Sequence, residues 1–144
     1  MCGIAGWFNL EDKGNNSRES LIDMLKQISY RGPDSIGAYI HDRVYMGNVR
    51  LSIIDITGGT QPISNEDGSI WVVYNGEIYN YRELREKLIA KGHKFKTLSD
   101  TEVLVHLYEE YGRDLTKHID GNFAFAIIDH QNDTFLLGRD RFGI

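Results

Sequence analysis

The feature that most constrains the fold is a series of short apolar runs separated by turns of a few polar or glycine residues. Each run is too short for an ordinary helix and has the composition of a buried or half-buried strand. The predicted strands cover residues 3–8, 38–40, 44–51, 70–74, 123–129 and 134–139. Turns of three residues, at 41–43 and 131–133, connect two pairs of these strands and predict hairpins. Because hairpins join antiparallel strands, we expect antiparallel sheets.

Three segments between the strands have the spacing of amphipathic helices. The first covers residues 20–29, the second runs from Asn80 to Gly92, and the third runs from Ser99 to Gly112. A glutamate lies three residues after each of the last two starts, which predicts a capping box. Helices that fall between groups of strands indicate an α+β fold, in which helices pack on the outer faces of the sheets.

Composition bounds the class of protein. The chain has 144 residues, of which 41% are hydrophobic and 26% charged, as in one globular domain. Its net charge of −5 argues against a surface for nucleic acid or anionic membranes. No apolar stretch approaches the ~20 residues of a membrane span, and the first residues lack a secretory pattern. One cysteine cannot form an internal disulfide, so we expect a reducing compartment, the cytoplasm.

Neither a metal site nor a nucleotide site is expected. The five histidines do not pair at a metal-ligand spacing, and no Cys-x-x-Cys or His-Glu-x-x-His motif is present. Structural or surface roles are therefore the ordinary interpretation of these histidines. The sequence also lacks a glycine-rich phosphate-binding loop. We expect no cofactor and no metal in this chain.

The cysteine lies at an informative position, because Cys2 directly follows Met1. Removal of Met1 would place a thiol and a free α-amino group on one residue. An α-amine has an ordinary pKa of about 7.7–8.0, so it can accept a proton near neutral pH. A lone cysteine is more often a small buried apolar residue. The nucleophile interpretation therefore depends on what the rest of the sequence supplies.

Seven segments in order carry a more specific signal. They are MCGIAG at 1–6, RGPD at 31–34, RLSIID at 50–55 with QP at 61–62, NGEIYN at 75–80, SDTEV at 99–103, GNFAFA at 121–126 and GRDRFG at 138–143. Together they resemble the glutaminase domain of asparagine synthetases, which are class II glutamine amidotransferases with an N-terminal nucleophile. Each motif is weak alone, but seven in order are specific.

The resemblance implies a four-layer αββα sandwich, the N-terminal nucleophile hydrolase fold, and hydrolysis of L-glutamine to glutamate and ammonia. Residues 1–144 would then be a glutaminase domain cut before its last strands. A C-terminal synthetase domain, which is not in this chain, would receive the ammonia and use ATP and magnesium. An exposed sheet edge at the cut would favour a homodimer or a strand-swapped oligomer.

By resemblance Cys2 is the nucleophile, and the side chain of Asn75 and the backbone N–H of Gly76 form the oxyanion hole. An Asn amide donates without carrying charge, and glycine lets the backbone approach a substrate closely. The ordinary interpretation of Asn-Gly is a hairpin turn. A predicted helix follows here instead of a returning strand, which weakens that interpretation.

The resemblance also assigns the substrate's charged groups. Arg50 would bind the α-carboxylate, because a guanidinium binds a carboxylate through two parallel hydrogen bonds. Asp100 would bind the α-ammonium with help from Glu77. The ordinary alternatives are a free surface arginine and an acid that is favoured in the first turn of a helix.

The loop of Arg31, Gly32 and Asp34 is expected to support the site, although a Gly-Pro turn alone would explain it. Two other functions are kept open. One is a non-catalytic module that binds glutamine or a partner. The other is the amidotransferase half of a different biosynthetic enzyme, of the amino-sugar, purine or β-lactam type.

Overall fold

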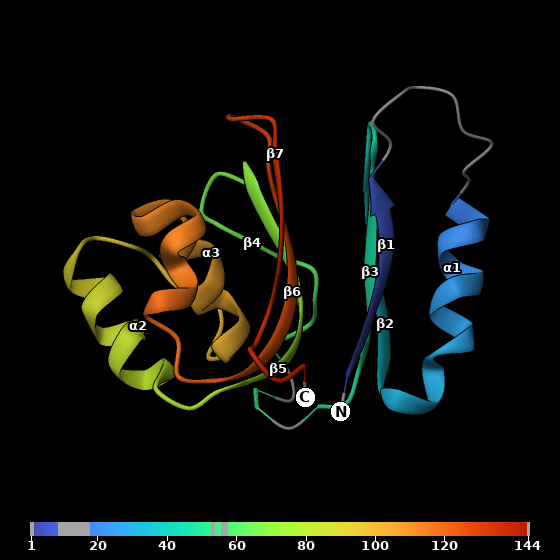
Figure 1. Cartoon of the computed structure of the whole chain (residues 1–144), viewed down its shortest axis with the longest axis horizontal. Coiled ribbons are helices and arrows are strands. Elements are labelled where there is room, and N and C mark those ends of the chain that lie inside the picture. Colours follow the sequence, from blue (N-terminus) through green and yellow to red (C-terminus); the bar gives the residue numbers. More distant parts are fainter. Residues whose placement is uncertain (1, 9–17, 53, 56–57, 144) are drawn as a thin grey trace.

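The computed structural model describes residues 2–8, 18–52, 54–55 and 58–143. Two antiparallel sheets lie face to face, and each is covered by helices on its outer side (Figure 1). This arrangement confirms the predicted α+β sandwich of four layers. No helix among the described residues is long and apolar enough to cross a membrane.

One sheet has three strands in the order β1-β3-β2, and the other has four in the order β4-β5-β6-β7. The strands are β1 (Gly3–Phe8), β2 (Ser35–His41), β3 (Val44–Arg50), β4 (Ile63–Ser64), β5 (Ile70–Ile78), β6 (Gly121–Asp129) and β7 (Thr134–Arg139). Both predicted hairpins are present, since β2 pairs with β3 and β6 pairs with β7 in antiparallel order. The short strand β4 has no counterpart in the sequence prediction.

The helices are α1 (Arg18–Gln27), α2 (Tyr81–Ala90) and α3 (Asp100–Tyr111), with short 3-10 helices at Ser29–Arg31 and Gly112–Lys117. Helix α1 covers the three-stranded sheet, and α2 and α3 cover the four-stranded sheet (Figure 1). The first helix thus begins and ends two residues earlier than predicted. All three are amphipathic, and their apolar faces pack on the sheets.

The two predicted capping boxes are wrong in detail. Asn80 precedes α2 but makes no side-chain cap; its amide joins His118 and Asp120 instead. Ser99 does cap α3, by accepting a hydrogen bond from the N–H of Thr101. The carboxylate of Glu102 accepts from the segment before α3 instead of from Ser99. Tertiary partners compete for these side chains and outweigh the local pattern.

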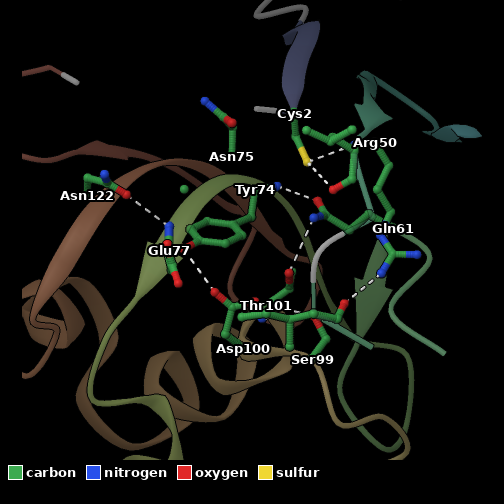
Figure 2. A pocket seen from close by; sticks show the side chains of 13 residues that line it. Cys2, Arg50, Gln61, Tyr74, Asn75, Glu77, Ser99, Asp100, Thr101 and Asn122 are labelled. Atoms are coloured by element: carbon green, nitrogen blue, oxygen red, sulfur yellow. Dashed lines mark hydrogen bonds between the residues drawn. The ribbon is translucent and has the colours of Figure 1, made fainter. Parts of the chain in front are cut away.

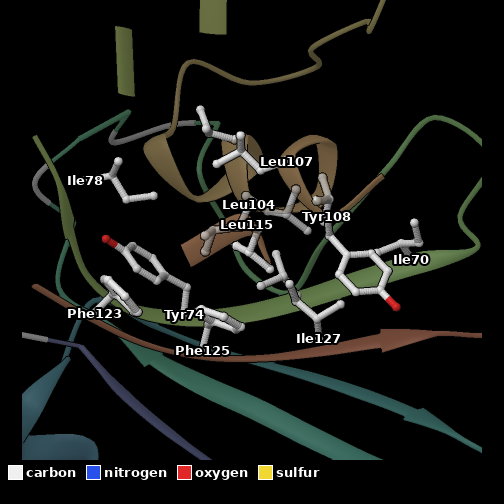
Figure 3. Packing of buried hydrophobic residues seen from close by; sticks show 14 of the residues in the cluster. Ile70, Tyr74, Ile78, Leu104, Leu107, Tyr108, Leu115, Phe123, Phe125 and Ile127 are labelled. Atoms are coloured by element: carbon white, nitrogen blue, oxygen red, sulfur yellow. The ribbon is translucent and has the colours of Figure 1, made fainter. Parts of the chain in front are cut away.

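Successive side chains of a strand point to opposite faces of the sheet, so one strand contributes to two separate hydrophobic clusters. On β5, Val72 and Tyr74 belong to the cluster beneath α2 and α3, whereas Val73 belongs to the cluster between the two sheets. Figure 3 shows the first cluster, to which α3 contributes Leu104 and Leu107 above the strands of the sheet. Alternate residues of one strand therefore serve different layers.

We expect Leu104→Ala to cost about 2–5 kcal/mol of unfolding free energy, because Leu104 is fully buried in this cluster and truncation leaves a cavity. The control is Leu98→Ala, since Leu98 is 66% exposed, and its cost should stay within about 0.5 kcal/mol. Urea unfolding measures both. Equal costs would contradict the assigned core.

Candidate active site

A pocket opens at one end of the two sheets, at the start of β1 and the end of β3 (Figure 2). Its walls come from both sheets, from the loop after β3 and from the start of α3. The lining residues are Cys2, Arg50, Leu51, Ile54, Gln61, Tyr74, Asn75, Gly76, Glu77, Ser99, Asp100, Thr101 and Asn122. The structure thus brings together all six residues that the sequence analysis assigned to catalysis and substrate binding.

Strand alternation explains how residues from different strands meet here. On β1, Ile4 packs between the sheets, and Cys2 lies two positions earlier on the same face. On β3, Met46 packs between the sheets, and Arg50 lies four positions later. Asn75 follows Val73 on β5 by two positions. The inner faces of the two sheets therefore deliver these three side chains to one gap.

Backbone contacts fix Cys2 in place. Its Sγ accepts a hydrogen bond from the N–H of Leu51 at 3.4 Å and lies 3.7 Å from the Leu51 carbonyl oxygen. The Nε of Arg31 donates to the carbonyl oxygen of Cys2 at 3.1 Å. The thiol is partly exposed to the pocket. The thiol therefore has a fixed position at the pocket wall, as a nucleophile needs.

The loop of Arg31, Gly32 and Asp34 lies against the end of β3. A Cβ on Gly32 would lie 2.5 Å from the carbonyl of Val49, so only glycine allows this contact. Asp34 donates its N–H to the Arg50 carbonyl at 3.0 Å and accepts from the N–H of Ser52 at 2.7 Å. The loop thereby braces the chain on both sides of Leu51, the residue that contacts the thiol. This placement fits the supporting role expected for it.

The edge of β5 that faces the pocket has an ordered pattern of donors. Tyr74 donates its N–H to Oε1 of Gln61 at 2.6 Å, and Ile78 donates its N–H to Oδ2 of Asp100 at 3.2 Å. Backbone N–H groups alternate between the two edges of a strand. Because Gly76 lies midway between these two residues, its N–H points to the same edge. That N–H therefore faces the pocket, as an oxyanion donor must.

Asn75 and Gly76 lie within β5, opposite Ala124 and Phe123 of β6, so the turn interpretation of Asn-Gly is wrong. The Asn75 Oδ1 is buried and has no hydrogen-bond partner among the described residues. Gly76 has φ of +154°, and a Cβ there would lie 2.1 Å from the carbonyl oxygen of Asn122. Close contact with β6 therefore requires glycine at this position.

Arg50 is the buried cation of the pocket, with 5% of its surface exposed. Its Nη2 donates to the carbonyl oxygens of Ile54 at 2.9 Å and Asp55 at 2.6 Å. Ile54 and Asp55, in the loop after β3, thus hold one side of the guanidinium. The surface-arginine alternative is wrong, because the head group is held beneath a loop at the pocket wall (Figure 2).

Asp100 is the buried anion on the opposite side of the pocket from Cys2 (Figure 2). Its Oδ2 accepts hydrogen bonds from the Tyr74 hydroxyl and the Ile78 N–H, each at 3.2 Å. Burial raises the pKa of the Asp100 carboxyl despite these bonds. Burial next to Asp100 also raises the pKa of Tyr74, so its hydroxyl stays a donor.

Glu77 also lines the pocket, and its N–H donates to Oδ1 of Asn122 at 3.1 Å. The sequence analysis gave no role to Gln61, Thr101 or Asn122. Gln61 joins β5 to α3, because its Nε2 donates to the Thr101 hydroxyl at 3.3 Å. All three residues fall inside the seven motifs quoted above, and this was the one feature of the sequence that could have identified them. Their spacing alone could not show which of them reach the pocket.

Comparisons with known proteins agree with this geometry. A family model described as glutamine amidotransferase domain matches residues 1–144. Asparagine synthetase [glutamine-hydrolyzing] 2 of Oryza sativa subsp. japonica is 43% identical over the whole chain, and the Arabidopsis thaliana protein of the same name is also 43% identical. The chain spans about a quarter of the length of these relatives, 24% and 25%.

A solved structure supports the fold assignment. Glutamine phosphoribosylpyrophosphate amidotransferase from B. subtilis, complexed with ADP and GMP, superposes with a TM-score of 0.57 and 28% identity. The match covers 72% of this chain and 24% of that one. The fold is that of an amidotransferase of the N-terminal nucleophile class. The chain belongs to the glutamine amidotransferase domain family.

We expect Gly76→Ala to destabilise the chain more than Gly68→Ala does. Both glycines have positive φ, at +154° and +75°, but only Gly76 meets backbone where a Cβ would be. Strain of about 1–3 kcal/mol is expected at either site, and the clash adds to it at Gly76 alone. Urea unfolding gives both values, and a smaller cost for Gly76→Ala would contradict the assigned contact.

Proposed function

We propose that this domain hydrolyses L-glutamine to glutamate and ammonia through Cys2. The observation that supports this most is the placement of the thiol on one sheet and the pocket-facing N–H of Gly76 on the other. A nucleophile and an oxyanion donor on opposite walls of one pocket can flank a carboxamide between them. Family membership supports the same reaction.

In this mechanism the Cys2 thiolate attacks the carboxamide carbon, and Gly76 N–H and the Asn75 amide stabilise the oxyanion. Expulsion of ammonia leaves a thioester on Cys2, and water then hydrolyses it to glutamate. The α-amine of Cys2 takes the thiol proton and passes it to the leaving ammonia through water. This step requires that Met1 be removed.

Arg50 and Asp100 supply the charges that a free amino acid needs. The guanidinium pairs with the α-carboxylate, and the Asp100 carboxylate pairs with the α-ammonium. Glu77 adds a second acid at the pocket wall. These roles, like the oxyanion roles above, are proposals that rest on the pocket geometry.

We further propose that the ammonia passes to a synthetase domain of the asparagine-forming type. The plant asparagine synthetases match the whole chain at 43% identity, whereas the purine-pathway enzyme matches 72% of it at 28%. Any ATP and magnesium requirement would belong to that synthetase domain. The cytoplasmic location and the homodimer or strand-swapped oligomer stay predictions.

We expect purified chain that begins at Cys2 to release glutamate from glutamine, and Cys2→Ser to release none. Chain that retains Met1 should also be inactive, because its α-amine is not on Cys2. Mass spectrometry establishes the N-terminus, and a coupled assay measures glutamate. Turnover by the Met1 form would contradict the α-amine mechanism. Glutamine binding without turnover by the Cys2 form would favour the non-catalytic alternative.

We expect Asp100→Asn to raise the KM for glutamine about tenfold or more, because a charged hydrogen bond contributes about 1.5–3 kcal/mol. In the parent chain KM should rise as the pH falls through the raised pKa of Asp100, since protonation removes the ammonium partner. The variant should lose this dependence.

The same variant should fold at least as stably as the parent at neutral pH. A carboxyl whose pKa is raised by folding contributes stability that is fully present below its unfolded pKa and is lost as pH rises through the folded pKa. An Asn at this position can still accept from Tyr74 and Ile78. A large loss of stability would show that Asp100 is structural.

A further inference from the structure

A second cluster of ionisable side chains lies on the outer side of the four-stranded sheet, away from the pocket residues of α3. It consists of Glu66, His93, His106 and Glu109, and we call it the His-Glu cluster. Glu66 comes from the turn before β5, His93 from the loop after α2, and the other two from α3. One ligand atom from each of the four lies within 4.8 Å of the others. No spacing in the sequence predicts this meeting.

The nitrogen–oxygen distances in the His-Glu cluster bracket the ligand separations of a tetrahedral site. Nδ1 of His106 lies 2.8 Å from Oε2 of Glu109 and 3.7 Å from Oε2 of Glu66. Nδ1 of His93 lies 3.3 Å from Oε2 of Glu109 and 3.9 Å from Oε1 of Glu66. Zinc bonds of about 2.0–2.1 Å place neighbouring tetrahedral ligands about 3.3 Å apart. The four ligand atoms, which lie within 4.8 Å of one another, would have to draw together to surround one ion.

Neighbouring groups also fix the positions of these ligands. Oε1 of Glu66 accepts from the Lys94 N–H at 2.8 Å, and Oε1 of Glu109 accepts from Nδ2 of Asn65 at 2.9 Å. Nε2 of His93 lies 2.9 Å from Oε1 of Glu110. A carboxylate behind a histidine is the usual arrangement around a metal, because it fixes the ring and its tautomer. Nδ1 of His93 is thereby turned toward the cluster.

Burial and charge also favour a cation here. His106 is fully buried, and its Nε2 lies 3.9 Å from Oε1 of the buried Glu102. The two histidines are thus flanked by Glu66, Glu109, Glu110 and Glu102. Lys91 pairs with Glu110, which leaves Glu66, Glu109 and Glu102 around the histidines, and a cation there would offset their charge.

We propose that Glu66, His93, His106 and Glu109 bind one Zn²⁺ ion in a structural site. Two imidazoles and two carboxylates suit zinc, and four protein ligands close its coordination shell. The ion would join the turn before β5, the loop after α2 and the middle of α3. This proposal departs from the expectation that the chain holds no metal.

The test uses the Cys2→Ser chain after treatment with a chelator, because this substitution removes the thiol as a zinc ligand outside the cluster. Titration calorimetry with Zn²⁺ alone should give one equivalent, and zinc should raise the Tm. His93→Gln and Glu66→Gln should each weaken binding at least tenfold. The side chains of His93 and Glu66 are 13% and 34% exposed, so these substitutions should destabilise the fold less than one at the fully buried His106. His118→Gln and Glu86→Gln are controls outside the cluster.

Cobalt provides an independent readout. Co²⁺ in place of zinc should show the visible absorption of a tetrahedral ion, and His93→Gln should lose it. Equal zinc affinity in His93→Gln, Glu66→Gln and both controls would overturn the proposal. So would the absence of stoichiometric binding in Cys2→Ser chain with the parent's secondary structure. Neither the zinc titration nor the cobalt spectrum depends on glutaminase activity. The zinc site and the proposed glutamine hydrolysis can therefore be refuted separately.

Discussion

The pocket depends on an edge of β5 that is not paired with a strand among the described residues. Strand β4 is two residues long and pairs only with Val72 and Trp71, so the edge beyond them meets other groups. Gln61 and Asp100 accept the N–H groups of Tyr74 and Ile78. The N–H of Gly76 lies between them and can serve a ligand. If β4 were longer, it would pair with this edge and remove the donor.

The two-layer packing of the sheets is the second requirement. A strand exposes alternate side chains to opposite faces, so the helix side of β5 receives Tyr74 and the sheet side receives Asn75. Tyr74 can therefore hold Asp100 of α3, while Asn75 faces the sheet that carries Cys2. A register shift of one residue would exchange these roles and dismantle the pocket.

Much of this could be predicted from sequence. Short runs with clear turns, such as the hairpin around Asp42, predicted the strands. The seven motifs predicted six of the thirteen residues that line the pocket. The prediction ended β5 at Tyr74, because Asn-Gly is a turn signal; close packing of Gly76 on β6 overrides that local preference. Asn80 failed as a cap because His118, 38 residues away, binds its side chain. The His-Glu cluster could not be predicted from the sequence, because its members come together only through tertiary packing.

Helix α3 connects the two sites physically. Its first residue, Asp100, is an acid whose burial works against folding, and it must be held in position by its surroundings. The segment before α3 is held by Glu102, which accepts hydrogen bonds from the N–H groups of Lys96 and Thr97. Glu102 in turn lies beside His106, one turn further along. An ion at the His-Glu cluster would therefore stiffen the same segment that delivers Ser99 and Asp100 to the pocket. It would act on substrate binding only through the position of α3, because none of its ligands lines the pocket.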